Sequence, residues 1–238
     1  MQQIIRSLTA KYRLTSSEVM IEIERTFSSI LSQWYRIEVM VFFRNDLQLE
    51  AVAYNNVGGV IMQRMIDFTT MRGFNTMQKN LEESLAKASL LKQTKSYKYY
   101  EKELRWGEIT ACDSENNLYV EIEVVPGEKI TAVCPHNRLG LHERHSDNFS
   151  LGKRRAFHLR RIDPVSLNGT GRLKVVADRV SKTLVETLLY DYLDSSAENM
   201  SLRCTNRYVG QKSFVFTTKR LPKSVIVATT LELGEHIE

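Results

Sequence analysis

The sequence contains few cysteines and no long apolar run. Its three cysteines, Cys112, Cys134 and Cys204, lie far apart in a chain of 238 residues and form no CxxC pair. An odd and scattered set of this kind argues against a disulfide framework. No stretch approaches the roughly 18 apolar residues that a membrane-spanning helix needs, and residues 1–13 lack the apolar centre of a signal peptide. We therefore expect a soluble protein of the reducing cytoplasm that has no membrane partner.

Signatures of catalysis and of nucleotide cofactors are missing as well. The glycines of residues 58–59 and 169–171 stand without the rest of a Walker or dinucleotide-binding fingerprint. No GxSxG motif and no activated-cysteine pattern occurs. The sequence predicts a binding protein rather than an enzyme, with no cofactor and no small-molecule substrate.

One group of residues suggests a metal site. Cys134, His136, His142 and His145 are all residue types that bind zinc. Their spacing, C-x-H-x5-H-x2-H, is not a familiar zinc arrangement, and the HERH at 142–145 is not an HExxH motif. We therefore predict that the protein holds no metal.

The first hundred residues carry helical patterns on both sides of a strand pattern. Residues 2–12 favour a short helix, and Thr15 with Glu18 fits a capping box that opens a second one. Alternating apolar residues over 37–43 and 47–53 predict a β-hairpin. Residues 76–104 contain no Gly or Pro, which predicts a long helix. This helix either acts as a rigid spacer or packs on the preceding residues. Residues 1–104 are therefore predicted to form a head with a connecting helix.

The pattern changes to short strands after Trp106. Turn residues such as Pro126-Gly127 divide the strands, and the longest irregular connection, 135–152, lies between the third and the fourth. Five strands in this arrangement match the outline of an OB-fold barrel. We predict an α+β protein with this barrel and a trailing helix at 180–193 as its second domain, residues 105–194. The predicted strands are 108–112, 118–125, 129–134, 154–162 and 172–178.

The last segment, residues 195–238, is predicted to be a short α/β tail. Its strand-like stretches are LRCTNRYV, SFVFTT and SVIVATTLEL. They are too few to build a large core of their own.

Several of these stretches resemble the N-terminal and S1 domains of the bacterial transcription elongation and termination factor NusA. ENNLYVEI followed by KITAVCPHNRL resembles the second and third S1 strands, and VVADRVSKTLVETLL resembles the last strand with its helix. LGKRRAFHLRRID falls at the fourth strand, and TSSEVMIEIERTFSSILSQWY at the second helix of the head. The resemblance implies a head that docks on RNA polymerase and a barrel that guides nascent RNA. The family's KH domains are not carried over, because residues 195–238 contain no GxxG and could hold only a truncated KH-like element.

The basic run LGKRRAFHLRRID, residues 151–163, is the strongest sign of a polyanionic partner. The whole chain has 33 Lys and Arg against 28 Asp and Glu, a net charge of +5, so bulk charge favours such a partner only weakly. S1 barrels bind single strands with cations along the backbone and aromatic rings under the bases. We therefore predict a site for single-stranded RNA. The predicted RNA-binding residues are Tyr119, His136, Arg138, Lys153, Arg154, Arg155, Phe157, His158, Arg160, Arg161, Arg172 and Lys174.

Two alternatives stay open at this point. Phe157 and Leu159 could form the inward face of their strand, which would leave the arginines as ordinary solvated charges. Glu121 and Glu123 share the outward face of Tyr119 and would repel phosphate. The second function class is accordingly a protein-interaction module that has lost RNA binding and modulates or competes with full-length NusA.

Overall fold

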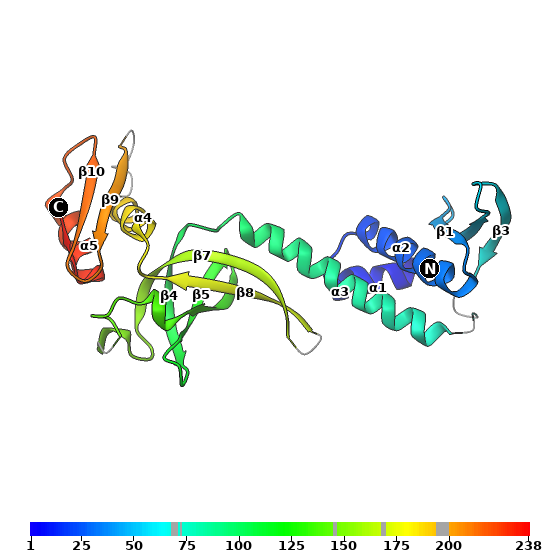
Figure 1. Ribbon diagram of the computed structural model, residues 1–238, viewed down its shortest axis with the longest axis horizontal. Helices are drawn as coiled ribbons and strands as arrows, with labels where there is room; N and C mark the ends of the chain where they lie inside the picture. Colours follow the sequence, from blue (N-terminus) through cyan, green and yellow to red (C-terminus); the bar gives the residue numbers. More distant parts are fainter. Residues whose placement is uncertain (68–70, 72, 145–146, 168–169, 194–199) are drawn as a thin grey trace. The chain divides into compact units, whose positions relative to one another are not determined.

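The computed structural model describes residues 1–67, 71, 73–144, 147–167, 170–193 and 200–238 (Figure 1). It confirms a mixed α+β protein, built from helices and three sheets. The chain divides into two compact units, Met1–Gln93 and Thr94–Glu238. No helix in the described ranges is both long and apolar enough to cross a membrane.

The first two elements of the first unit are helices, as predicted. Helix α1 covers Gln2–Tyr12 and α2 covers Ser16–Tyr35. Thr15 caps α2 through the predicted box, because its Oγ1 accepts from Glu18 N at 3.2 Å and its own N donates to Glu18 Oε2 at 2.7 Å. Lys92 and Thr15 lower the pKa of Glu18 to about 2. The buried face of α2, which includes Val19, Ile23 and Phe27, forms the core of this unit.

The first unit also holds a three-stranded antiparallel sheet. Its strands are β1 (Glu38–Phe43), β2 (Leu49–Tyr54) and β3 (Val60–Ile66), in the order β1-β2-β3. The first two are the predicted hairpin, and β3 was not predicted. Polar side chains of α2 bind the outer edge of β1: Val41 N donates to Ser28 Oγ at 2.8 Å and Phe43 N to Glu24 Oε1 at 2.7 Å. The opposite edge strand, β3, is exposed along almost its whole length.

The long helix α3 covers Phe74–Lys98 and ends earlier than the predicted 104. Its first turns pack in the core of the first unit through Met77, Leu81 and Leu85. Tyr97 is instead buried in the core of the barrel, where its hydroxyl donates to Glu128 Oε2 at 2.7 Å. The two compact units divide inside the helix, after Gln93, whereas the predicted first domain extends to 104.

The second unit contains a closed five-stranded barrel in the order β4-β5-β6-β8-β7. Alternate residues fill its interior, among them Val120 and Ile122 of β5 and Phe157 and Leu159 of β7. Each predicted strand is present, and β4 and β7 are longer than expected. Part of the predicted turn at 168–171 lies outside the described residues. The strands are β4 (Leu104–Cys112), β5 (Leu118–Val125), β6 (Glu128–Cys134), β7 (Arg154–Leu167) and β8 (Thr170–Asp178).

The C-terminal part packs on the outside of this barrel. It consists of α4 (Lys182–Leu193), β9 (Leu202–Tyr208), β10 (Lys212–Thr217), α5 (Lys223–Leu233) and β11 (His236–Ile237). Strand β10 pairs antiparallel with β9 and parallel with β11. The predicted domain boundary at 194–195 lies outside the described residues.

The segment 224–233 is a helix, so its prediction as a strand was wrong. Its valines and threonines favour strands locally. Two terminal residues favour the helix: Pro222 stands at its N-cap, and Gly234 closes it with φ 65°. Val225, Thr229 and Leu233 then recur on one face, which is buried against α4 and its neighbours. Tertiary burial of this face outweighs the local β preference.

Candidate nucleic-acid interface

The outer surface of β5 and β6 carries the aromatic residue of the predicted site. Along β5 the inward residues are buried and the residues between them point out, so Tyr119 lies on the outside of the barrel. Tyr119 is half-buried, and its hydroxyl lies 3.5 Å from Asp113 Oδ2 in the β4–β5 turn. One ring edge is therefore held by the turn, while part of the ring remains accessible.

Tyr119 belongs to a transverse row of outward residues that ends at Arg161. The pairings Tyr119↔Val133, Val133↔Val176 and Val176↔Arg161 join β5, β6, β8 and β7. Directly paired residues point to the same face of a sheet, and adjacent strands lie about 4.8 Å apart. Tyr119 and Arg161 are thus three strands apart around the closed barrel, and of the two valines between them Val133 is half-buried and Val176 is buried. The outer surface of the barrel therefore carries a partly accessible ring on β5 and a cation on β7, and rings and cations are the groups that bind single-stranded nucleic acids.

Two further cations extend the positive end of this row. Arg172 and Lys174 lie on β8 opposite Val165 and Asp163, so they share the outer face of Arg161. Asp163 is occupied by Arg161, whose Nε lies 2.6 Å from its Oδ2. Arg172 and Lys174 are exposed and make no ion pair with any described residue. They are free to contact phosphate. Figure 1 shows β7 and β8 as two long neighbouring strands.

The other end of the outer surface is acidic, as the sequence indicated. Glu121 follows Tyr119 on the outer face of β5 and lies opposite Glu108 of β4. Lys129 Nζ lies 2.5 Å from Glu121 Oε1, and Glu123 Oε1 accepts from Gly127 N at 2.6 Å. Phosphates are therefore repelled from β4 and β5 and attracted towards β7 and β8.

Two of the predicted RNA-binding residues are buried, and we withdraw them. The ring of Phe157 is fully buried in the barrel core, so no base can stack on it. His158 points out but is covered, and its Nδ1 lies 3.1 Å from the buried Asp178 Oδ2. Burial acts to raise the pKa of Asp178, but hydrogen bonds with His158 and Ser181 hold it below its usual value.

Two of the predicted arginines are engaged inside the protein. Arg155 Nη1 donates to Glu232 Oε2 at 3.1 Å, and its side chain is only 20% exposed. Arg160 Nη1 lies 3.8 Å from Asp178 Oδ2 but remains half exposed. The outward face of β7 near Arg155 is covered by the C-terminal part, since Ala156 lies in its core. The first half of the basic run is therefore not a free strand facing RNA.

The remaining predicted residues lie around the β6 end of the barrel. Lys153 and Arg154 are exposed at the start of β7, where Arg154 is opposite Glu108. His136 and Arg138 are half-buried in a short 3-10 helix, His136–Arg138, that follows β6. The structure thus brings Arg161, Arg172 and Lys174 together on the outer side of β7 and β8, and it places Tyr119 on the outer side of β5.

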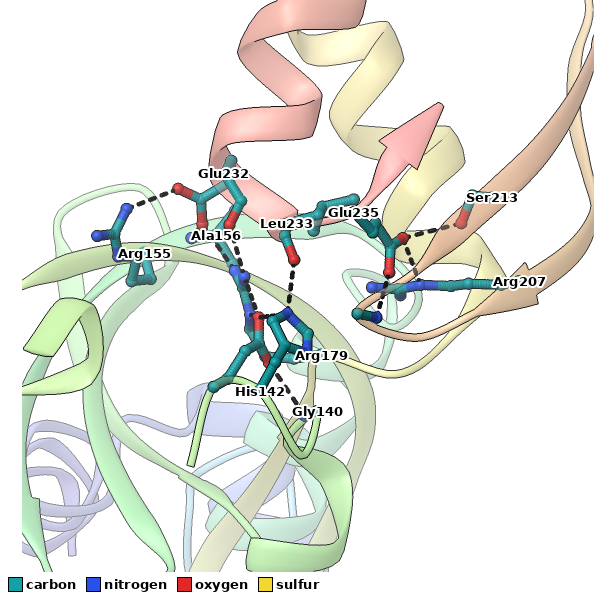
Figure 2. A network of polar contacts seen from close by, with 12 residues as sticks. Gly140, His142, Arg155, Ala156, Arg179, Arg207, Ser213, Glu232, Leu233 and Glu235 are labelled. Carbon is teal, nitrogen blue, oxygen red and sulfur yellow. Dashed lines mark hydrogen bonds and ion pairs between the residues drawn. The ribbon is translucent and has the colours of Figure 1, made fainter. Parts of the chain in front are cut away.

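A buried polar network that the sequence did not predict joins the barrel to the C-terminal part (Figure 2). Arg179 is fully buried between Glu143 and Glu232. Its Nε and Nη2 donate to Glu143 Oε1 at 2.9 and 2.5 Å, and its Nη1 donates to Glu232 Oε1 at 2.7 Å and to Ala156 O at 2.6 Å. Burial acts to lower the pKa of Arg179, but the two carboxylates raise it above its usual value. No local pattern marks these three residues as partners.

One smaller contact also crosses this junction, and a second lies within the C-terminal part (Figure 2). His142 Nε2 lies 2.8 Å from Leu233 O, at the end of α5. Within the C-terminal part, Arg207 Nε and Ser213 Oγ donate to Glu235 Oε1 at 2.9 and 2.8 Å. The C-terminal part is therefore fixed to the outside of β4 and β7. In the outer row, Arg161 is exposed, Tyr119 and Val133 are half-buried and Val176 is buried.

Two residues of the suspected zinc set make other contacts. Cys134 is buried in the barrel core, and His142 contacts Leu233 O. Among the described residues, no three side chains of His, Cys, Asp or Glu come together as a metal site requires. His145 lies outside the described residues. That the protein holds no metal stays a prediction.

No protein-family model matches the chain, and no curated protein shows significant sequence similarity to it.

Proposed function

We propose that the chain is an RNA-binding transcription factor that docks on RNA polymerase through Met1–Gln93 and contacts nascent single-stranded RNA through its barrel. The observation that carries the RNA part is the outer row from Tyr119 to Arg161, with Arg172 and Lys174 beside it. The partner polymerase comes from the resemblance of the quoted stretches to NusA. No catalytic step is part of this proposal.

We further propose that the barrel is an OB-fold of the S1 type. Its β5 and β6 are the second and third of five strands in a closed barrel. OB-folds bind oligonucleotides on the face of these two strands and with the loops that join strands 1 and 2 and strands 4 and 5. Tyr119 and Val133 lie on that face, which supports the assignment. The C-terminal part would be a truncated KH-like element without the GxxG loop that clamps a backbone.

The proposed phosphate contacts have a salt signature. Replacing Arg172 and Lys174 with alanine should weaken binding of unrelated single strands to a similar degree, because phosphate contacts carry little sequence information. The plot of log affinity against log salt should flatten by about 0.7 for each lost contact. Fluorescence anisotropy at several salt concentrations measures both quantities.

A matched control removes two exposed cations from α3 instead, Lys79 and Lys87. This variant should keep the affinity and salt slope of the wild type. Both variants should keep their stability within about 0.5 kcal/mol, as exposed substitutions usually do. An unchanged salt slope in the folded Arg172→Ala, Lys174→Ala protein would contradict the placement of RNA on β8.

Docking of the first unit is supported by an apolar groove on its sheet. The groove has a volume of about 880 Å³ and is lined by Trp34, Ile61 and Met62, among others. These side chains are 43–59% exposed, which is unusual for large apolar residues that have no partner. The groove lies beside the exposed edge strand β3. An apolar groove next to a free strand edge suits a protein partner better than RNA.

A charged side chain placed in the groove should prevent docking, because the docked partner would bury the charge. Ile61→Glu in the full chain should abolish co-purification with core RNA polymerase, because a carboxylate would be desolvated in an apolar contact. Ile21→Glu is the control: Ile21 is 55% exposed and Ile61 57%, and Ile21 lies outside the groove. If both variants co-purify like the wild type, the groove is not the docking site.

The second candidate function, a protein-interaction module without RNA binding, is favoured by the acidic outer face of Glu108, Glu121 and Glu123. The internal use of Arg155 and His158 favours it as well. The two functions differ in one measurement. A chain that co-purifies with polymerase but shows no salt-dependent affinity for single-stranded RNA would be such a module.

A further inference from the structure

The small sheet of β9, β10 and β11 has one face that packs on helices and one that points away from them. Leu202, Cys204 and Val215 lie in the core that this sheet shares with α4 and α5. Successive residues of a strand point to opposite faces, so the neighbours of these residues along β9 and β10 lie on the other face. That face carries side chains which the fold of the C-terminal part does not require.

Three aromatic rings lie on this second face, which we call the aromatic face: Tyr208, Phe214 and Phe216. Phe216 is 70% exposed and Tyr208 is 54% exposed, whereas Phe214 is half-buried. The rings of Tyr208 and Phe214 meet edge to face, with their centroids 6.3 Å apart. Three rings on one face of two paired strands form a patch, unlike the single apolar residues that are scattered over any protein surface.

Two cations lie beside these rings. Arg203 is exposed, pairs directly with Phe216 in the register, and makes no ion pair with any residue that the structure describes. Lys212 Nζ lies 4.8 Å from the centre of the Phe214 ring. Its contact with Glu238 at 3.4 Å joins two side chains that are about half exposed, and such surface pairs are weak. Both cations are therefore available to a bound anion.

The accessible charge of residues 200–238 is almost entirely positive. Two of the three carboxylates in this segment, Glu232 and Glu235, are buried and bound to arginines. Glu238 is thus the remaining acidic side chain, and it faces the accessible cations Arg203, Lys212, Lys219, Arg220 and Lys223. Like charges would repel a second copy of this surface, whereas a polyanion would be attracted to it.

We propose that the aromatic face is a second binding surface for single-stranded RNA. Bases stack on Phe216 and Tyr208, and Arg203 and Lys212 contact phosphates. Proteins hold single strands on open surfaces through this combination of rings and cations, and sheets with exposed rings stack two or three bases. The surface differs from a KH clamp, which holds the backbone with a GxxG loop. That the single strand is RNA rests on the proposed function.

Photo-cross-linking tests where the RNA lies. An oligoribonucleotide that contains 4-thiouridine is bound to the full chain and irradiated, and the tryptic peptides are analysed by mass spectrometry. Trypsin cuts after Lys and Arg, so Tyr208 lies on the peptide 208–212 and both phenylalanines lie on 213–219. Nucleotide adducts should appear on these two peptides and disappear when an excess of unlabelled oligoribonucleotide competes. Absence of adducts from both peptides would overturn the proposal.

A binding measurement isolates the aromatic face from the barrel. The full chain carries Tyr119→Ala, Arg172→Ala and Lys174→Ala, which remove the proposed barrel contacts. In this background Phe216→Ala should weaken the affinity for the same oligoribonucleotide about five- to a hundredfold at an unchanged salt slope, because a base loses its ring and no counterion is involved. Fluorescence anisotropy at several salt concentrations measures both quantities.

Leu231→Ala in the same background is the matched control. Leu231 is 76% exposed and belongs to the same C-terminal part, but it lies on α5 and not on the sheet. This variant should keep the affinity of the background. Equal affinities of the Phe216→Ala and Leu231→Ala proteins would contradict stacking on the aromatic face.

Arg203→Ala tests the phosphate contact separately. In the same background it should flatten the plot of log affinity against log salt by about 0.7, the value for one lost contact with a single strand. Phe216→Ala should leave this slope unchanged. An unchanged slope in the folded Arg203→Ala protein would overturn the pairing of cation and ring on this face.

The outcomes separate this inference from the proposed function. Adducts on barrel peptides alone, with no loss of affinity in Phe216→Ala, would overturn the second surface and leave the barrel site standing. Adducts on 208–219 alone, with the expected loss in Phe216→Ala, would support the second surface and contradict RNA contact by the barrel. A dimer in analytical ultracentrifugation that dissociates in Phe216→Ala would assign the aromatic face to a second copy of the chain and overturn the proposal.

Discussion

Replacing Arg179 with methionine should destabilise the second unit by about 3–5 kcal/mol, as expected when one partner of a buried ion pair is removed. The substitution leaves the buried carboxylates of Glu143 and Glu232 without their main partner. It also removes the bond to Ala156 O, which links β7 to this network. The C-terminal part should consequently detach from the barrel at lower denaturant concentration.

The two tryptophans make this effect measurable in each unit. Trp34 lies in the first unit and Trp106 in the second, where its Nε1 donates to Asp191 Oδ2 at 2.9 Å. In a Trp34→Phe background, urea unfolding followed by fluorescence therefore reports the second unit alone. Arg179→Met should shift this transition to lower urea.

A compensated variant tests whether the cost comes from unpaired charge. Adding Glu143→Gln and Glu232→Gln to Arg179→Met removes both stranded carboxylates and should recover part of the loss, because neutral amides are cheaper to bury than carboxylates. If Arg179→Met lowers the free energy of unfolding by less than about 1 kcal/mol, the network contributes no more than a weak surface ion pair. That result would contradict this account.

Phe157→Ala should cost about 3–5 kcal/mol of stability, the usual range for deleting a buried phenylalanine side chain. The ring is fully buried and packs with Ile109, Leu159 and Ala177 in the barrel core. In the fraction that remains folded, the affinity for single-stranded RNA should be unchanged, since no base contacts this ring. Thermal or urea unfolding and RNA titration of the same sample give both quantities.

Tyr119→Ala is the matched counterpart on the outside of the barrel. It should weaken RNA binding by about 1–3 kcal/mol through the loss of a stacking platform, at an unchanged salt slope. Its stability should fall much less than that of Phe157→Ala, because Tyr119 is only half-buried. The opposite pattern, with RNA affinity lost in folded Phe157→Ala and kept in Tyr119→Ala, would reverse the inward and outward assignments of these rings.

Local patterns in the sequence were enough to predict most of the elements. The capping box of Thr15 and Glu18, the first hairpin and all five barrel strands follow from periodicity and turn residues. The exposed strand β3 was missed because turn residues and a short apolar segment do not distinguish an edge strand from a loop. The strand-like segment 224–233 became a helix because its neighbours bury a helical face of it.

The sequence by itself determined which side of β5 faces the barrel core, because strand alternation has a period of two and places Tyr119 opposite to Val120. It also located the cations of β8, Arg172 and Lys174. Only the tertiary structure decided which residues of the basic run stay available. Arg155 is engaged by Glu232, which lies 77 positions further along the chain. An ion pair between a strand residue and a helix this far along the chain is a non-local event, and no local periodicity encodes it.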